Sequence, residues 1–301
     1  MTDTVQQIEL TSNGAALDTS PERLGRLVAS DPDAPIAALR EQYRAQGYLW
    51  LRGFFDREAI LDFRGRFFAA FADLNLLAPG SDPREGLFSG NKVNVGAVNQ
   101  RLMEFVRSAA YESFCLQPRL WRFYDAFLEG PSYLHKRKII RYTTPHSSRS
   151  TGAHYDLIYL RSGTDRVCSS WIPLGDTPVH MGGLVYLENS DALGQRMEAQ
   201  FSEINKALPR EEQISAFNKN MDQGWLTQDL RTLAEGADAR WLVADYEAGD
   251  MVVHSAYMIH AATDNRDPQG RLRLSTDIRY QNVRDEIDAR WTNHWSLEDM
   301  L

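Results

Sequence analysis

The sequence predicts a mainly β fold, an antiparallel sandwich or barrel, with a layer of helices on its N-terminal side. Two observations lead to this prediction. Apolar residues follow helical spacing up to about residue 130, and short β-branched or aromatic runs separated by turn residues follow from there. Because these runs do not alternate with helices, a doubly wound parallel sheet is disfavoured.

The first half of the chain contains the expected helices. Ile36, Leu39 and Tyr43 have helical spacing, Gly47 is a helix stop, and YLWLRG reads as a short strand. A second helix, which Asp56 can cap, places four apolar side chains on one side: Ile60, Phe63, Phe67 and Phe71. Proline and glycine make residues 73–96 a loop, and helical spacing returns over residues 100–128.

The second half contains the expected strands, beginning at residue 133. They are KIIRYTT, VCSSWIPL, GGLVYLE, RWLVADY, DMVVHSAYMIH and RLRLSTDIRYQN. A charged stretch, residues 191–236, interrupts them and is expected to form helices and loop. We therefore expect one domain over residues 1–301. It divides into a flexible arm (1–20), a mainly helical support layer (21–130), a β core (131–285) that includes the insertion, and a C-terminal tail (286–301).

Composition narrows the possible functions. The net charge is −8 and the isoelectric point is about 5.4, with no basic stripe, so nucleic acid is not an expected partner. No apolar run is long enough for a membrane span, and the N-terminus lacks the features of a signal peptide. Two cysteines exclude a disulfide scaffold and a cysteine zinc site. The expected location is the cytoplasm.

A candidate metal site begins with His154-Tyr155-Asp156. On a strand, residues two apart face the same side, so the imidazole and the carboxylate can point together. Taken alone, the triplet equally fits a buried histidine bonded to an aspartate. A further histidine, His254 or His260, would complete a two-histidine, one-carboxylate triad, which is typical of non-haem Fe(II) oxygenases. The two lie six residues apart, so strand alternation does not choose between them.

Several segments together resemble the phytanoyl-CoA dioxygenase family of Fe(II)/2-oxoglutarate oxygenases. They are REQYRAQGYLWLRGFFDREAI, HYD, WIPLGDTPVHMGGLVYLENSD and AGDMVVHSAYMIHAATDNRDPQGRLRLS, and the resemblance covers roughly residues 36–285. It implies a double-stranded β-helix, the jelly-roll or cupin-like fold. In the family, the distal histidine follows a Gly-Asp turn by about ten residues, which selects His260 after Gly249-Asp250. The chain departs from the family at Asp191, where a histidine is usual, and it retains Asp156, which disfavours halogenation.

The resemblance also implies the cofactors and their residues. Fe(II) is bound by His154, Asp156 and His260, 2-oxoglutarate and O2 are cosubstrates, and ascorbate is helpful in vitro. Arg271, eleven residues after His260, is expected to bind the far carboxylate of 2-oxoglutarate, with Arg273 as its competitor on the same strand face. Further expected contacts to the cosubstrate come from four residues: Ser275, Thr151, Trp171 and Arg141, the last of which could instead contact the substrate.

The expected reaction is oxidation of a small organic metabolite, by hydroxylation or else by desaturation, epoxidation or rearrangement, in specialised-metabolite biosynthesis. Tyr155, Tyr159 and Phe88 are expected on the pocket wall, and the 84–96 loop and the 191–236 insertion are expected near its mouth. A monomer or a homodimer is expected. Two alternatives remain at this point, a cupin-like metalloenzyme that does not use 2-oxoglutarate and a non-catalytic ligand-binding jelly-roll protein.

Overall fold

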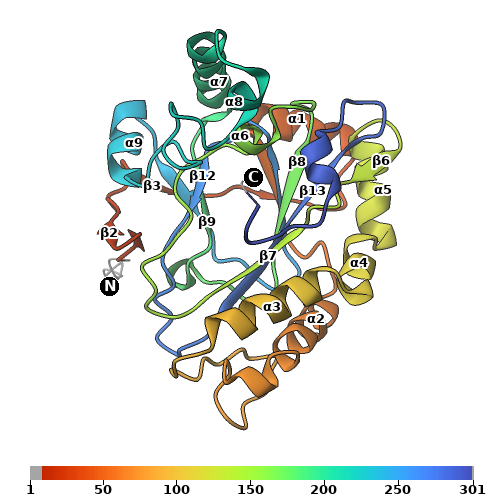
Figure 1. Cartoon of the computed structure of the whole chain (residues 1–301), viewed down its shortest axis with the longest axis vertical. Helices are drawn as coiled ribbons and strands as arrows, with labels where there is room; N and C mark the ends of the chain where they lie inside the picture. Colours follow the sequence, from red (N-terminus) through yellow and green to blue (C-terminus); the bar gives the residue numbers. More distant parts are fainter. Residues whose placement is uncertain (1–8, 300–301) are drawn as a thin grey trace, which may run out of the picture.

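A computed structural model describes residues 9–299, in which two β-sheets face each other and helices cover the outer side of the larger sheet (Figure 1). The seven-stranded sheet contains β4 (Ala29–Ser30), β5 (Tyr48–Leu51), β6 (Ser132–Leu134), β7 (Ile139–Thr143), β8 (Cys168–Pro173), β11 (Met251–Ser255) and β13 (Arg273–Asn282). The four-stranded sheet contains β3 (Leu24–Arg26), β9 (Leu184–Leu187), β10 (Trp241–Val243) and β12 (His260–Ala262). The predicted mainly β, jelly-roll class is confirmed, and over residues 9–299 the two sheets do not close into a barrel.

Strands that are far apart in the sequence are neighbours in the larger sheet. The strand order of this sheet is β4-β5-β11-β8-β13-β6, and β7 pairs with the other end of β13. The order in the smaller sheet is β12-β9-β10-β3. Strands β1 (Thr11–Ser12) and β2 (Ala15–Ala16) form a separate hairpin. Neighbours in both sheets are antiparallel except for β10–β3 and β4–β5, which are parallel. Each of these two pairs contains a strand from the first part of the chain.

Helices form two groups. Those that pack on the larger sheet are α1 (Ile36–Gln46), α2 (Arg57–Ala69), α3 (Val95–Val106), α4 (Ala109–Cys115) and α5 (Pro118–Phe127). Those of the predicted insertion are α7 (Asp191–Asn205), α8 (Arg210–Ile214) and α9 (Leu230–Ala237), while α6 (Leu157–Leu160) follows the HYD triplet. Short 3-10 turns are η1 (Ala72–Leu74), η2 (Val179–Met181) and η3 (Ala289–Thr292). Among residues 9–299, none of the helices combines the length and apolar character that a bilayer span requires.

Local signals correctly predicted the first two helices. Gly47 ends α1 in the left-handed region at φ 77°, where its N–H donates to the Tyr43 carbonyl. The Asp56 carboxylate accepts a hydrogen bond of 2.8 Å from the Ala59 N–H at the start of α2. The predicted helix over residues 100–128 is instead three helices, because Ser108 caps α4 and Pro118 starts α5.

Alternating side chains divide the larger sheet into two faces. On β11, Met251 and Val253 pack toward the helices, whereas Val252 packs between the sheets. Trp171 on β8 and Tyr186 on β9 belong to the same cluster between the sheets. The inner faces of the two sheets therefore share an aromatic layer, and the active-site cavity lies beside it.

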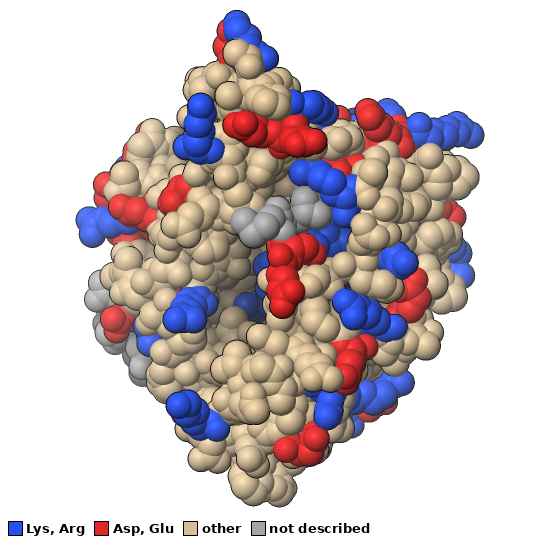
Figure 2. All heavy atoms as spheres, in the orientation of Figure 1, with Lys and Arg blue, Asp and Glu red and all other residues tan. Residues whose placement is uncertain are grey.

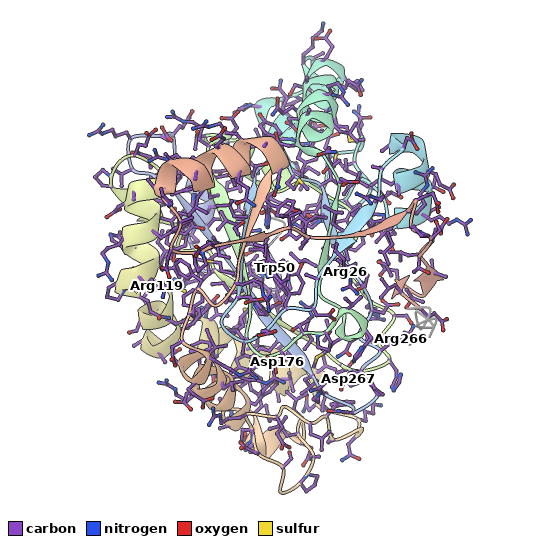
Figure 3. The ribbon with its side chains drawn as sticks, turned by 180° about the vertical axis from the view of Figure 1, so that it is seen from behind. Arg26, Trp50, Arg119, Asp176, Arg266 and Asp267 are labelled. Carbon is purple, nitrogen blue, oxygen red and sulfur yellow. The ribbon has the colours of Figure 1, made fainter. Side chains whose placement is uncertain are left out.

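The Gly249-Asp250 turn has a structural role. Asp250 accepts a hydrogen bond of 3.0 Å from the indole N–H of Trp50, which packs between the sheets and is labelled in Figure 3, and another of 3.0 Å from the Gly53 N–H. Gly249 has φ 111°, and a Cβ there would lie 2.8 Å from the Phe55 carbonyl oxygen. This turn fixes the start of β11 against β5.

Two predicted strands differ from the structure, and both differences concern candidate ligands. DMVVHSAYMIH is not one strand, because β11 ends at Ser255 and β12 begins at His260, in the other sheet. His154 is not in a regular strand but in an isolated bridge to His260, and Asp156 immediately precedes α6. His254 and His260 therefore approach the site from opposite sheets, which alternation along one strand could not show.

Candidate metal centre and active-site cavity

The three predicted metal ligands lie together. One ligand atom from each of His154, Asp156 and His260 falls within 4.8 Å of the others, and all three residues are buried. Two backbone hydrogen bonds fix the histidines side by side, since the His154 N–H donates to the His260 carbonyl at 3.0 Å and the reverse bond measures 2.9 Å. This bridge between distant parts of the chain sets the spacing of the site.

Both histidine rings present the same nitrogen to the centre. His154 Nδ1 lies 2.9 Å from the Gly152 carbonyl oxygen, and His260 Nδ1 lies 2.9 Å from the Met258 carbonyl oxygen. Because a carbonyl only accepts, each Nδ1 carries the proton and donates. Each Nε2 therefore keeps its lone pair, 3.7 Å and 3.8 Å from Asp156 Oδ1 for His154 and His260 respectively.

The Asp156 carboxylate uses its two oxygens differently. Oδ1 faces the two histidine Nε2 atoms, whereas Oδ2 accepts from the Ser169 hydroxyl and lies 3.2 Å from His254 Nε2. Arg279 Nη2 lies 3.1 Å from both oxygens. A carboxylate with one oxygen fixed and the other turned to two imidazoles suits monodentate binding of a metal ion.

Charges around the centre favour the protonation states that a metal needs. Burial alone would raise the pKa of Asp156, but Arg279, His254 and His260 outweigh it and hold that pKa well below its usual value. Burial lowers the pKa of His154, and burial together with the two neighbouring histidines lowers that of His260. Two neutral imidazoles and one carboxylate are therefore ready to bind a cation.

The donor set fits iron. Two neutral histidines and one carboxylate on a single side leave room for further ligands, as in the facial triad of non-haem Fe(II) enzymes. The nearby ring of His254 does not belong to the group of ligand atoms that converge. Its hydrogen bond to Asp156 makes it a support for that ligand.

A cavity of about 400 Å³ opens beside the centre, on the face that Figure 2 shows hollowed. Its lining includes His154 and His260 and draws on both sheets, the insertion and the C-terminal tail. Five predicted contact residues lie on its wall: Thr151, Trp171, Ser275, Arg141 and Tyr159. The insertion contributes three more: Phe217, Gln223 and Trp225.

Arg271, the arginine predicted to bind 2-oxoglutarate, lies outside the cavity. Arg271 precedes β13, lies in a bridge to Leu87 and does not line the cavity. Its guanidinium donates to the buried carboxylate of Asp267, which is labelled in the lower half of Figure 3, at 2.7 Å and 3.0 Å. Arg273 lines the cavity instead, and its Nη1 donates to the Ser275 hydroxyl at 2.7 Å.

Arg273 has the properties of a buried carboxylate ligand. Burial lowers its pKa to about 10, which leaves it charged at neutral pH. Its side chain points between the sheets because it begins β13 on the face that also carries Ser275, Asp277 and Arg279 into the cavity. Arg273, the competitor named from the sequence, therefore lies on the cavity wall, whereas Arg271 does not.

Two predicted wall residues lie elsewhere. Tyr155 is 1% exposed and points into the apolar cluster beneath the insertion, where its hydroxyl donates to Glu198 at 2.8 Å. Phe88 packs against the cluster between helices and the larger sheet, and its N–H donates to the Gly270 carbonyl. The 84–96 loop is held on that side by Arg64, which donates to the carbonyls of residues 84 and 85, so it does not cover the cavity.

Sequence reasoning missed three residues at the site. Ser169 and Arg279 contact Asp156, and Trp291 from the tail lines the cavity with its indole N–H bonded to the Tyr159 carbonyl. A signal existed for Arg279, since it lies on the same face of β13 as Arg273 and Ser275. The role of Trp291 depends on how the tail folds back, which no local pattern shows.

Fold and site define a jelly-roll oxygenase with a two-histidine, one-carboxylate centre. Residues 43–272 match the phytanoyl-CoA dioxygenase (PhyH) family, to which the chain belongs. The predicted family is thus confirmed, and the protein is an enzyme of the Fe(II)/2-oxoglutarate-dependent oxygenase class.

Individual proteins agree with this placement. A 1-deoxypentalenic acid 11-beta-hydroxylase of Streptomyces arenae is 27% identical over 252 residues, which span 81% of this chain and 80% of that protein. The non-haem alpha-ketoglutarate-dependent carbocyclase SnoK of nogalamycin biosynthesis has a TM-score of 0.56 at 16% identity, covering 91% of this chain and 92% of that one. The epimerase SnoN, in a complex with Fe3+, alpha-ketoglutarate and nogalamycin RO, has a TM-score of 0.54 at 18% identity, covering 90% and 94%. The structures of SnoK and SnoN share the fold of this chain.

Proposed function

We propose that the protein hydroxylates a small organic metabolite in specialised metabolism, with Fe(II) bound by His154, Asp156 and His260. The observation that carries the proposal is that His154, His260 and the buried guanidinium of Arg273 line one cavity, with Asp156 grouped with the two histidines directly behind it. The relatives that are named hydroxylases of 1-deoxypentalenic acid favour hydroxylation over desaturation, epoxidation or rearrangement.

Different residues of the chain bind the cosubstrate and position the substrate. When bound, Fe(II) and 2-oxoglutarate would activate O2, so that one oxygen atom would be inserted into a substrate C–H bond and the other would enter succinate, with release of CO2. Arg273 and Ser275 hold the far carboxylate of the cosubstrate, since a guanidinium fork matches a carboxylate. Thr151 and Trp171 border the same space. The aromatic walls fix the substrate and exclude water.

Partners and location follow the same reasoning. We infer that the partner is a small molecule, because the cavity is of ligand size and a net charge of −8 disfavours nucleic acid and anionic membrane surfaces. Both cysteines, Cys115 and Cys168, are free and buried, which suits the reducing cytoplasm. The protein is inferred to act as a monomer or a homodimer, which sedimentation would distinguish.

The test is turnover with defined additions. Purified protein is supplied with Fe(II), ascorbate, O2 and 2-oxoglutarate, and succinate and oxidised product are measured against a panel that includes 1-deoxypentalenic acid. We expect substrate-dependent succinate, lost in Asp156→Ala and kept in Asp62→Ala, whose carboxylate lies on the exposed face of α2. Turnover without 2-oxoglutarate would favour the cupin-like alternative. Failure to bind Fe(II) would favour a non-catalytic ligand-binding protein.

A further inference from the structure

The cavity holds more positive charge than the metal and cosubstrate require. Four arginines line it: Arg137, Arg141, Arg273 and Arg279. Its lining contains one carboxylate, Asp277, and Asp156 lies directly behind. Since Fe(II) and the two carboxylates of 2-oxoglutarate cancel in charge, the bound cosubstrate does not neutralise the remaining guanidinium groups.

Two of the four arginines already have partners suited to their positions. Arg273 bonds to Ser275 at the cosubstrate end of β13. Arg137 forms an ion pair with Asp299, and its guanidinium lies 5.2 Å from the Trp291 ring centroid. The guanidinium groups of Arg273 and Arg137 therefore already have partners in the protein without a bound substrate.

The other two arginines have unused donors. Arg279 gives Nη2 to Asp156, while its Nε and Nη1 are buried without a hydrogen-bond partner among residues 9–299. Arg279 is 5% exposed, so little water can reach these two donors and replace the missing hydrogen-bond partner. Arg141 is exposed to the cavity and forms no hydrogen bond or ion pair within the described part of the chain.

Both guanidinium groups line the cavity that His154 and His260 also line. Arg141 stands opposite Ser275 in the β7–β13 register, and Arg279 is four residues further along β13 on the same face. Arg279 contacts Asp156 directly, and Arg141 lines the cavity together with His154 and Tyr159. An anion between these arginines would therefore lie beside the metal ligands.

The rest of the wall is aromatic. Tyr159, Phe217, Trp225 and Trp291 face the same cavity from α6, the insertion and the tail. Such walls bind an apolar skeleton, while a few polar groups fix its orientation. The combination selects a molecule with a hydrophobic body and one anionic end.

We infer that the substrate is an apolar carboxylic acid whose carboxylate is bound by Arg141 and by the free donors of Arg279. The inference rests on the proposed function and names its substrate class. A carboxylate is the anion that a guanidinium fork matches with two parallel hydrogen bonds. Anchoring that end holds a C–H bond of the skeleton at the metal side and makes Arg141 a specificity-determining residue.

The experiment compares acids with their uncharged amides. Fe(II)-loaded protein with saturating 2-oxoglutarate, kept anaerobic, is titrated with matched acid and primary-amide pairs. The pairs have straight-chain, bicyclic and tricyclic skeletons, and one is 1-deoxypentalenic acid with its amide. Binding is followed by quenching of tryptophan fluorescence, since Trp225 and Trp291 line the cavity. We expect at least one acid to bind about tenfold or more tightly than its amide, as charge-assisted hydrogen bonds imply.

Arg141→Gln should abolish this preference and leave the affinities for the amide and for 2-oxoglutarate unchanged. Arg284→Gln, which removes an exposed arginine outside the cavity, should behave as the unaltered protein. Melting temperatures confirm that both variants are folded.

Two outcomes would overturn the inference. One is a panel in which no acid binds more tightly than its amide. The other is an Arg141→Gln protein that loses affinity for 2-oxoglutarate but keeps its preference for the acid, which would assign Arg141 to the cosubstrate. Calorimetric titration of 2-oxoglutarate separates the two proposals. If 2-oxoglutarate binds and no acid is preferred, only the substrate class is wrong, whereas a protein that does not bind 2-oxoglutarate contradicts the proposed function itself.

Discussion

His254 Nε2 lies 3.2 Å from Asp156 Oδ2, and His254 Nδ1 lies 3.1 Å from the Tyr186 hydroxyl. Because an ionised carboxylate only accepts, Nε2 donates to Asp156, and Nδ1 accepts from Tyr186. This chain of contacts holds Oδ2 away from the metal position, so that Oδ1 faces His154 and His260. His254 is thus a positioning residue, although by sequence it rivals His260 as a ligand.

Replacement of His254 should weaken iron binding without abolishing it. We expect His254→Leu to reduce Fe(II) affinity about 10- to 100-fold, because it removes the donor that orients Asp156. His254→Gln, whose amide N–H can replace the Nε2 donor, should retain most of the affinity. Competition with a chelator under anaerobic conditions measures both values. If His260→Ala kept its iron while His254→Gln lost it, His254 would be the ligand.

Arg273 and Arg271 make opposite predictions for the cosubstrate. Arg273→Gln should weaken 2-oxoglutarate binding about 100-fold, because it removes a buried guanidinium from the cavity. Arg271→Gln should leave that affinity within about twofold, since its guanidinium is bonded to Asp267 outside the cavity. Calorimetric titration of 2-oxoglutarate into the Fe(II)-loaded variants distinguishes them. Loss of binding in Arg271→Gln alone would show that family spacing identified the right arginine.

These two arginines show what sequence could and could not predict. Spacing from His260 selected Arg271, but the side chain's position depends on Asp267, with which it pairs in the loop before β13. A nearby carboxylate can hold a guanidinium away from a site, and the number of residues between a histidine and an arginine does not reveal this pairing. Alternation along RLRLS nevertheless identified Arg273 as the competitor.

Sequence signals predicted structure best where the hydrogen bonds involved lie within a few residues. Gly47 and Asp56 act through hydrogen bonds within a few residues, so both helix boundaries could be predicted. The break between β11 and β12 has no glycine or proline to mark it and depends on Ser255, whose hydroxyl accepts from the N–H groups of Tyr257 and Met258. Pairing of His154 with His260 spans more than a hundred residues and can be recognised only through the family resemblance.

The insertion is fastened to the site by a buried ion pair. Glu198 on α7 accepts from Arg161 at 2.7 Å and from the Tyr155 hydroxyl at 2.8 Å, and the Arg161 and Glu198 side chains are 4% and 13% exposed. Glu198→Ala should cost about 3–5 kcal/mol in the free energy of unfolding, because it leaves Arg161 buried without its carboxylate. Urea denaturation followed by circular dichroism measures this loss.

The matched control for Glu198 is the exposed pair of Glu203 and Lys206 on the same stretch of chain. Their side chains are 71% and 68% exposed, so Glu203→Ala should change the free energy of unfolding by less than about 1 kcal/mol. Equal and small losses in both variants would mean that Glu198 does not fasten the insertion.

The buried imidazole of His135 should make the free energy of unfolding depend on pH. The residue is 0% exposed, its Nε2 lies 2.7 Å from Gln281 Oε1, and burial lowers its pKa to about 4. In the unfolded chain a histidine titrates near its ordinary value of about 6.5, so between those values the unfolded state binds the proton and the folded state does not. Stability is therefore fully present above about pH 6.5 and is lost as the pH falls toward 4, by about 2 kcal/mol at pH 5.

His135→Gln tests this because the amide N–H can still donate to Gln281 but does not titrate. Urea unfolding at pH 7 and pH 5 should show that the variant loses about 2 kcal/mol less between the two values than the unaltered protein, since only the imidazole carries the proton linkage. His146→Asn removes an exposed histidine whose φ of 61° asparagine tolerates, and it should leave the pH dependence unchanged. The same loss of stability in His135→Gln as in the unaltered protein would show that other groups, and not His135, cause the acid sensitivity.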